Sequence, residues 1–250
     1  MTEIKGISVD EWKKKICEEA ERLRPQLIQL SHSIHDEPEI GFQEFKSSAK
    51  ICDFLEKQGF ETERGYCDLP TSFKAVKKGT GKGPVVAFLA EYDALRGVGH
   101  GCGHNLLGTG SVAAAIAVKE YLEKNGKEGT VIFFGCPGEE GGSGKSFMAR
   151  DGVFDNLDFA VTWHPGDKNV VSVGSSLANY QIIYRFYGQA SHAAACPELG
   201  RSALDAVELM NTGVQYLREH IIQEARIHYA ITNTGGYSPN VVQPYSEVLY

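Results

Sequence analysis

The 250-residue sequence has no long apolar run, no low-complexity tract and no excess of basic residues. No segment approaches the roughly 20 apolar residues that a membrane-spanning helix needs, so we expect no membrane partner. The first ten residues include Glu3, Lys5 and Asp10 and lack the apolar stretch of a secretory signal. A net charge of −7 provides no broad surface for neutralising phosphates, which argues against a nucleic-acid partner.

The sequence lacks any CxxC pair of cysteines. The six cysteines are Cys17, Cys52, Cys67, Cys102, Cys136 and Cys196. In a chain of this length, such scattered positions favour reduced thiols over a disulfide framework. Reduced thiols and the missing secretory signal together predict a cytoplasmic protein. The hydrophobic content of 42% is sufficient for one sizeable core, or for one core and a small second one.

Helical and strand patterns alternate through the first two thirds of the chain. Apolar residues recur at helical spacing over 10–31, 44–58, 105–121 and 144–150, and apolar runs of strand length occupy 84–90, 130–134 and 158–163. This alternation predicts an α/β fold with a mixed, mostly parallel sheet of buried strands and helices on both faces. Pro25 should kink or divide the first helix. The lysines of residues 74–82 are interpreted as a solvated turn between strands.

After about residue 176 the pattern changes. Alternating aromatic and aliphatic residues at 180–187 predict a half-buried antiparallel strand, and 202–221 predicts an amphipathic helix. Further strand candidates occupy 227–233 and 241–250. We therefore expect two domains, residues 1–176 and a small α+β domain at 177–250. Because the chain stops within a predicted strand, we expect it to be truncated.

Polar residues follow three of the predicted strands. Glu91 and Asp93 follow the first strand, Glu139 and Glu140 the second, and His164 the third. The carboxyl ends of parallel strands meet at one edge of a sheet, where α/β proteins bind ligands. We expect these side chains to line one crevice.

The segment GHGCGH at 99–104 places Cys102 and His104 two residues apart in a glycine-rich turn. Glycine allows the tight bend that would direct both side chains at one ion, and thiolate and imidazole suit borderline or soft divalent metals. A tight turn with a packed cysteine is the alternative interpretation. His100 is a further ligand candidate, for which a turn role is equally compatible.

Glu139 and Glu140 are adjacent carboxylates framed by glycines. One of them can bind a metal while the other acts as a general base. Two solvated carboxylates on a loop are the alternative.

Two histidines complete the set of candidates. His164 alone fits a buried core histidine as well as a ligand, but its combination with Cys102, His104 and a carboxylate favours a divalent metal site. His192, in GQASHAA at 188–194, fits either a turn or an active-site role supplied by the second domain.

The order of these motifs resembles the aminoacylase and carboxypeptidase G superfamily of two-metal peptidases (clan MH), and within it the amidohydrolase branch. The motifs that carry the resemblance are AEYDAL at 90–95, GHGCGHNLLG at 99–108, GCPGEEGGSGK at 135–145, TWHP at 162–165, LGRSALDAV at 199–207 and SPNVVQ at 238–243. The resemblance covers essentially the whole chain. It implies a zinc-peptidase-like catalytic domain at 1–176, and a lid or dimerisation domain at 177–250. The C-terminal return of the catalytic domain, with a final histidine ligand, would lie beyond residue 250.

The resemblance also implies a set of metal ligands. Cys102 would bridge two divalent ions, Mn2+ or Zn2+, and His104, Glu140 and His164 would be further ligands. Glu91 stands where other branches place a metal-binding histidine.

Catalytic and substrate-binding roles follow from the same resemblance. Glu139 would be the general base, and Asp93 a carboxylate that orients a ligand. His192 would polarise the scissile carbonyl in the site of a partner subunit, and Asn240 would contact the substrate.

The implied activity is metal-dependent hydrolysis of the amide bond of N-acyl amino acids, with aryl amides of the p-aminobenzoyl-glutamate type favoured. A broad aminoacylase or dipeptidase is one alternative, and an inactive dimerising fragment is another. The implied partners are this small-molecule substrate and a second copy of the chain bound through the lid domain, or a second related subunit.

Overall fold

The structure, a computed structural model, describes residues 9–79 and 82–250. The first eight residues, which contribute to the predicted absence of a secretory signal, and residues 80–81 of the lysine-containing stretch lie outside the described residues. The chain divides into two compact units, Met1–Asn169 and Val170–Tyr250. Their boundary and the predicted boundary at 176/177 both lie in a stretch, 169–182, without helix or strand. The roles of the units as catalytic and lid domains stay predictions.

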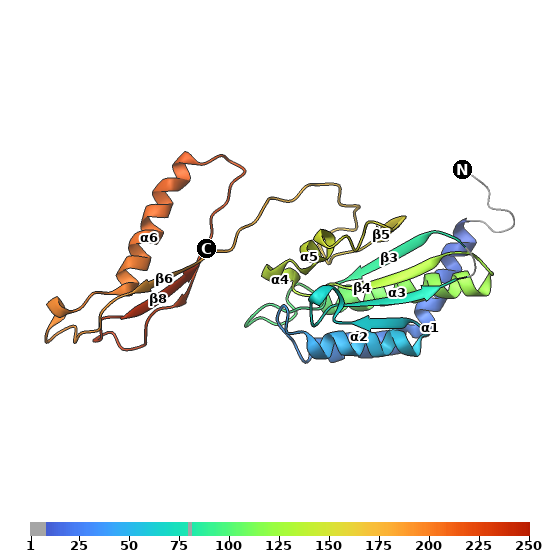
Figure 1. Cartoon of the computed structure of the whole chain (residues 1–250), viewed down its shortest axis with the longest axis horizontal. Helices are drawn as coiled ribbons and strands as arrows, with labels where there is room; N and C mark the ends of the chain where they lie inside the picture. The colour runs from blue at the N-terminus through green and yellow to red at the C-terminus, as the bar shows by residue number, and fades with distance from the viewer. Residues whose placement is uncertain (1–8, 80–81) are drawn as a thin grey trace. The chain divides into compact units, whose positions relative to one another are not determined.

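A five-stranded sheet is the centre of the first unit, with strand order β1-β2-β4-β3-β5 (Figure 1). The strands are β1 (Glu61–Arg64), β2 (Phe73–Lys78), β3 (Val85–Ala90), β4 (Thr130–Gly135) and β5 (Phe159–Val161). Strand β3 is parallel to β4 and β5, whereas β2 is antiparallel to β1 and β4. The mixed α/β sheet is confirmed. Its described strands form as many antiparallel as parallel neighbours, because β1 and β2 add an antiparallel edge.

Strand β2 shows that the interpretation of residues 74–82 as a turn is wrong for its first part. Lys74, Lys77 and Lys78 lie in β2 and pair with β4. Phe73 and Ala75 in the same strand are buried, which gives the two-residue period of a strand with one face in the core. The lysines obscure this period in the sequence because Lys77 lies on the same face of the strand as the buried Phe73 and Ala75.

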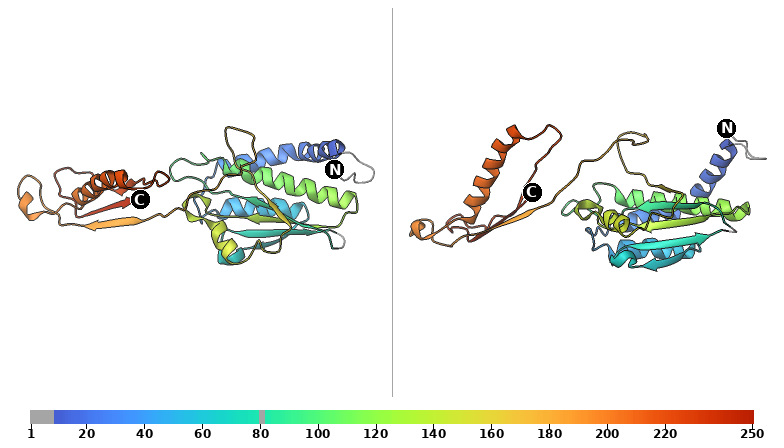
Figure 2. Two further views of the ribbon diagram at one scale, coloured as in Figure 1. Left: turned by 90° about the horizontal axis from the view of Figure 1, so that it is seen from above. Right: turned by 45° about the horizontal axis from the view of Figure 1, so that its top comes forward.

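Three helices cover one face of the sheet. They are α1 (Val9–His35), α2 (Phe45–Lys57) and α3 (His104–Lys124), and α1 and α3 lie side by side (Figure 2). Their apolar faces meet the strands in a buried core that includes Ile34, Ile51 and Phe133. Pro25 lies within α1 and does not divide it. Because Pro25 and Glu21 are exposed, water can satisfy the Glu21 carbonyl that loses its helical donor.

The opposite face of the sheet carries a smaller core. It is formed by Ala87, Ile132, Phe134, Cys136 and Met148, the last from helix α5 (Gly144–Arg150). A short helix, α4 (Glu139–Gly142), precedes α5. Helices therefore lie on both faces, as predicted.

Strand β5 differs from its prediction as a buried strand. It has three residues, and Phe159 and Val161 are 54% and 43% exposed. It pairs with β3 at one edge of the described sheet. Its apolar composition predicts a strand correctly, but burial depends on a neighbour on the other side, and no described strand lies there.

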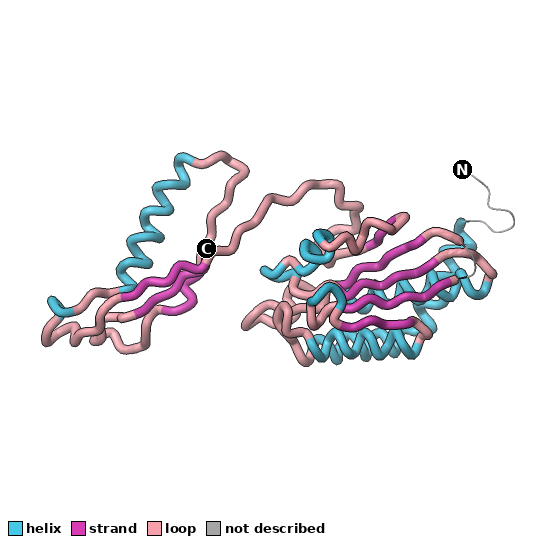
Figure 3. Tube along the Cα trace, viewed as in Figure 1, coloured by secondary structure: helices cyan, strands magenta, loops and turns pink. Residues whose placement is uncertain are grey.

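The second unit contains a three-stranded antiparallel sheet and one longer helix (Figure 3). Its strands, in order β6-β8-β7, are β6 (Ile183–Tyr187), β8 (Tyr245–Leu249) and β7 (Ala230–Asn233). Helix α6 (Ala203–Leu217) packs on the sheet through buried Ala203 and Val207, opposite Val248. This is the α+β pattern expected from the sequence.

Three short 3-10 helices are η1 (Tyr66–Asp68), η2 (Pro197–Leu199) and η3 (Arg218–His220). Within the described residues, no helix combines the length and apolar content needed to cross a membrane.

Candidate metal centre

The segments that follow β3, β4 and β5 lie at the same edge of the sheet, because these strands are parallel and β3 lies between the other two. The structure brings two groups of donor atoms together there. Cys102, His104 and His164 offer atoms within 4.8 Å of one another, and so do Glu91, His104 and Glu139. His104 belongs to both groups and is the centre of the site.

Two glycines set the backbone of the site. Gly103 has φ of 83° and lies directly before α3, so the chain reverses between Cys102 and His104. A side chain at Gly103 would meet the ring of Pro165 at 3.0 Å. Gly138, with φ of 62°, places Glu139 at the start of α4 in a similar manner. Few residues other than glycine adopt this left-handed conformation without strain.

Asp93 fixes the orientation of His104. Its Oδ1 accepts a hydrogen bond from Nδ1 of His104 at 3.0 Å, and its Oδ2 accepts one from the backbone N–H of Glu140 at 2.8 Å. Burial by itself would raise the pKa of Asp93, but the hydrogen bonds from His104 and Glu140 outweigh it, so this pKa lies below its ordinary value. Since Nδ1 of His104 donates to Asp93, its Nε2 is the nitrogen that faces the site.

The donor atoms fit a divalent cation. Nε2 of His104 and Oε2 of Glu91 are buried and 3.1 Å apart, which is an ion pair only when His104 is protonated, and neither atom forms a hydrogen bond among the described residues. Buried polar atoms are nearly always partnered, so each such exception calls for an explanation. A cation held by these atoms would satisfy both. The residue types are also suitable, because imidazole, thiolate and carboxylate are the ligands of zinc and related ions.

Cys102 and His164 form the more exposed side of the site. Sγ of Cys102 is 3.4 Å from Nε2 of His164, while Nδ1 of His164 donates to the carbonyl of Pro165 at 2.8 Å. The second nitrogen of His164 is therefore held by the backbone, which is the usual arrangement behind a metal-binding imidazole. Burial and the nearby carboxylate of Glu140 raise the pKa of Cys102 to about 11. A bound cation would favour the thiolate instead.

The two adjacent glutamates take different positions. Oε2 of Glu139 is 3.7 Å from Nε2 of His104. Burial and the charges of Glu91 and Glu140 raise the pKa of Glu139. Glu140 lies outside both groups of converging donor atoms, although its carboxylate is close enough to the Cys102 thiol to raise the pKa of that group. The converging donor atoms thus include Glu139, the predicted base, and not Glu140, the predicted ligand, so the roles of the two carboxylates stay predictions.

Two residues of the site were not singled out from the sequence. Glu44 is fully buried, its Oε1 accepts the backbone N–H of Gly138 at 2.7 Å and its Oε2 accepts the hydroxyl of Thr71 at 2.8 Å. Burial raises the pKa of Glu44 despite these bonds. Lys145 forms an ion pair with Oε1 of Glu91. A cation close after an acidic pair was a visible signal for Lys145, whereas nothing local marks Glu44.

His100 lies outside both groups of donor atoms. Its ring is stacked near that of His35, with centroids 6.2 Å apart, and neither of its nitrogens has a hydrogen-bond partner among the described residues. The structure therefore does not bring His100 to the converging donor atoms, and its role as a ligand gains no support.

His192 and Asn240 lie together in the second unit. The backbone N–H of Ala193 donates to the carbonyl of Asn240 at 2.9 Å. Nδ1 of His192 accepts the backbone N–H groups of Ala194 and Ala195 at 3.2 and 3.1 Å. Because Nδ1 accepts, Nε2 carries the proton of the neutral ring, and the exposed side chain presents an N–H donor. The turn role and the donor role are therefore compatible.

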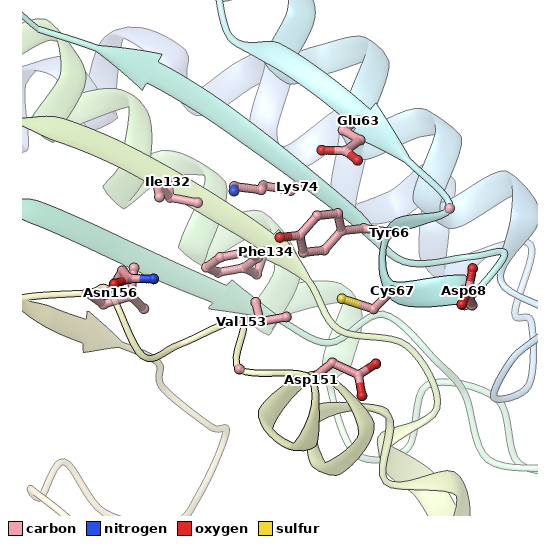
Figure 4. Close-up of a pocket in the computed structure, with 13 residues that line it drawn as sticks. Glu63, Tyr66, Cys67, Asp68, Lys74, Ile132, Phe134, Asp151, Val153 and Asn156 are labelled. Carbon is pink, nitrogen blue, oxygen red and sulfur yellow. The ribbon is translucent and has the colours of Figure 1, made fainter.

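Two hollows of the first unit lie apart from these donor atoms. One, of about 510 Å³, is bordered by β2, β4, η1 and the end of α5, and includes Tyr66, Cys67 and Asp151 (Figure 4). The other, of about 620 Å³, is an apolar groove between α1 and α3 beside Trp163. Neither hollow is lined by a residue predicted for the site.

The sequence profile of Peptidase family M20/M25/M40 matches residues 85–247. The chain belongs to this family. It is 53% identical over 244 residues to one subunit of the p-aminobenzoyl-glutamate hydrolase of Escherichia coli (strain K12), a match that covers 91% of this chain and 50% of that protein. It is 36% identical over 248 residues to the Xaa-Arg dipeptidase of Mus musculus, covering 95% of this chain and 57% of that protein.

Solved structures share the fold. A dinuclear metal binding peptidase of family M20 from Bacillus subtilis superposes with a TM-score of 0.57 at 23% identity, covering 92% of this chain and 64% of that one. The chain spans about half the length of the curated relatives that it matches. As a member of this family it combines the M20 fold with a potential metal site.

Proposed function

We propose that this M20 chain belongs to a hydrolase that cleaves the amide bond of N-acyl amino acids, with aryl amides such as p-aminobenzoyl-glutamate as its substrates. The observation that carries the proposal is His104, whose Nε2 is buried without a partner among the described residues and shared by two groups of converging donor atoms. The 53% identity to a subunit of the Escherichia coli p-aminobenzoyl-glutamate hydrolase supports the choice of substrate.

Four residues would hold two divalent cations, Mn2+ or Zn2+: Cys102, His104 and His164, whose donor atoms converge, and Glu140, whose carboxylate lies by the Cys102 thiol. Bound divalent cations lower the pKa of a bound water toward neutrality and polarise a carbonyl oxygen. The geometry of Asp93 supports its task of orienting His104, because it fixes the nitrogen that faces the site.

Glu139 is the general base of this proposal. Its carboxylate lies beside His104, and its raised pKa suits a group that accepts a proton from water and passes it to the leaving amine. Glu140 is not suited to this task, because its backbone is tied to Asp93 and its carboxylate lies by the Cys102 thiol.

His192 and Asn240 are proposed as substrate contacts. His192 presents an Nε2–H that can donate to the carbonyl oxygen under attack, acting in the site of a partner subunit. We propose a homodimer through the second unit, or assembly with a second related subunit. The second arrangement is supported by the similar Escherichia coli protein, which is one subunit of its hydrolase. A cytoplasmic location is part of the proposal.

A second candidate function is dipeptidase or broad aminoacylase activity, which the 36% identity to an Xaa-Arg dipeptidase favours. The two functions share the metal site and differ in the amine released. An inactive dimerising form of this chain is a third alternative, which is compatible with a chain that spans about half the length of the curated relatives it matches.

The test is hydrolysis of p-aminobenzoyl-glutamate by the Mn2+- and Zn2+-loaded protein, measured against a panel of acyl amino acids and dipeptides. We expect the aryl amide to be cleaved with the highest kcat/KM. Equal rates across the panel would contradict the proposed preference for p-aminobenzoyl-glutamate. The proposal of amide hydrolysis as the reaction would still stand. Metal binding without hydrolysis by this chain, with hydrolysis by a form extended at its C-terminus, would establish the inactive form.

A further inference from the structure

Glu91 has an unusual environment for a buried carboxylate. Only 6% of the residue is exposed, and its two oxygens face different groups. Oε1 is paired with Nζ of Lys145, and Oε2 is 3.1 Å from Nε2 of His104. The ion pair satisfies the first oxygen, while Oε2 has no hydrogen-bond partner among the described residues.

We propose that Glu91 is an additional metal ligand, and that Lys145 is a positioning residue that directs one oxygen of Glu91 to the ion held by His104. The inference rests on the proposed metal centre and deepens it, since it adds Glu91, one of the converging donor residues, to the four proposed ligands Cys102, His104, Glu140 and His164. The proposed site then contains Glu91 as a further carboxylate ligand and Lys145 as the cationic side chain that orients this carboxylate.

The distance between Glu91 and His104 supports direct ligation. Two atoms at 2.0–2.2 Å from one ion lie roughly 3.0–3.5 Å apart in octahedral or tetrahedral geometry. Oε2 of Glu91 and Nε2 of His104 are 3.1 Å apart. Without a proton or a cation between them, two lone pairs would face each other in a buried site, which is unfavourable. Asp93 accepts the Nδ1 proton in either case, so a cation at Nε2 would take the place of a second proton on His104.

Lys145 explains why one oxygen of Glu91 remains available. It comes from α5, and its side chain is 29% exposed. By pairing with Oε1 it orients the carboxylate so that Oε2 faces His104. It also offsets part of the negative charge that Glu91 and Glu139 bring to the site. Outer residues that orient metal ligands in this way typically change metal affinity 10- to 100-fold.

A purely electrostatic role for Lys145 makes the opposite prediction. A cationic side chain near a cation site repels the ion, so removal of its charge would tighten binding. If Lys145 acts by positioning Glu91, its removal weakens binding, and only while Glu91 is present. The sign of the change therefore separates the two roles.

The experiment is a titration of the metal-free 250-residue chain with Co2+, followed by the thiolate-to-cobalt absorption of Cys102 and by the visible bands that report the coordination of the ion. We expect Glu91→Gln to weaken Co2+ binding about 100-fold and to change the visible bands. Lys145→Met should weaken binding about tenfold, and Lys145→Arg should restore it. In the Glu91→Gln background, Lys145→Met should cause no further loss.

Matched controls come from a second lysine–glutamate pair, Lys119 and Glu123, near the other end of α3. Lys119→Met and Glu123→Gln should leave the affinity unchanged. Melting temperatures of the metal-free variants report folding. The Glu91→Gln, Lys145→Met double variant removes both charges and so avoids an unpaired buried one, which keeps the test decisive if a single variant does not fold.

Three other outcomes would contradict the ligand role of Glu91, the positioning role of Lys145 or the metal centre itself. Unchanged Co2+ affinity and visible bands in Glu91→Gln would overturn the inference and leave the metal centre intact. Tighter binding in Lys145→Met would overturn the positioning role. Failure of the unsubstituted chain to bind Co2+ would overturn the proposed metal centre, and the inference with it.

Discussion

Oδ1 of Asp93 lies 3.0 Å from Nδ1 of His104, and both side chains are buried. The contact selects which nitrogen of His104 faces the site. We predict that Asp93→Asn lowers metal affinity 10- to 100-fold, because an amide holds the ring less firmly and no longer increases its basicity. Isothermal titration with Zn2+ measures the change. An affinity within twofold of the unsubstituted chain would show that Asp93 does not orient the ligand.

Glu139→Gln should separate proton transfer from metal binding. The amide cannot accept the proton of water, so we expect the rate of hydrolysis to fall at least 100-fold. Metal content, measured by mass spectrometry, should stay unchanged, because Glu139 is not among the proposed ligands. Near-full activity in this variant would disprove the assignment of the base, and loss of metal would make Glu139 a ligand instead.

Glu44 should make stability depend on pH. Its pKa in the folded protein lies above the ordinary value of 4.5, so the folded state binds this proton more tightly than the unfolded chain. The stability from this proton is complete below pH 4.5 and is lost as pH rises through the folded pKa. Relative to Glu44→Gln, the unsubstituted protein should therefore lose stability as the pH rises above 4.5. Urea unfolding at several pH values measures this.

The matched control is Glu63→Gln, at an exposed glutamate of β1, which should keep the pH dependence of the unsubstituted chain. Glu44→Ala should be destabilising by about 1–3 kcal/mol, because the N–H of Gly138 loses its buried acceptor. Identical pH profiles for Glu44→Gln and the unsubstituted chain would rule out the proposed titration.

His192 should exist as one tautomer. Two backbone N–H groups donate to its Nδ1, so the proton of the neutral ring should reside on Nε2. Nitrogen-15 chemical shifts of the imidazole at a pH where it is neutral distinguish the two forms. His228 serves as a comparison within the same unit. A signal for the Nδ1–H form would remove the structural basis for His192 as a donor.

The part of the site that lies at strand ends could be predicted from the sequence. Apolar runs indicate β3, β4 and β5, and polar residues follow each run closely in the chain. Parallel pairing then places Glu91, Glu139 and His164 at one edge. The prediction needed only local pattern and one rule of sheet topology.

Other parts were hidden for physical reasons. Strand β2 carries three lysines among its six residues, so the strand period is hidden and the segment was interpreted as a solvated turn. The exposure of β5 depends on what lies beside it, which composition does not encode. Glu44 and Lys145 meet partners 94 and 54 positions away, and no local pattern specifies such contacts.

The hydrogen bond from Gly138 to Glu44 also has a consequence for the order of folding. Glu44 is synthesised 94 residues before its donor, together with the helix that carries it. Contacts between distant residues form late, because the intervening chain must first lose its freedom. We therefore expect the loop of Glu139 and Glu140 to become ordered only after β4 has joined the sheet. Pulsed hydrogen exchange during refolding should show protection of the Gly138 amide after that of Phe133.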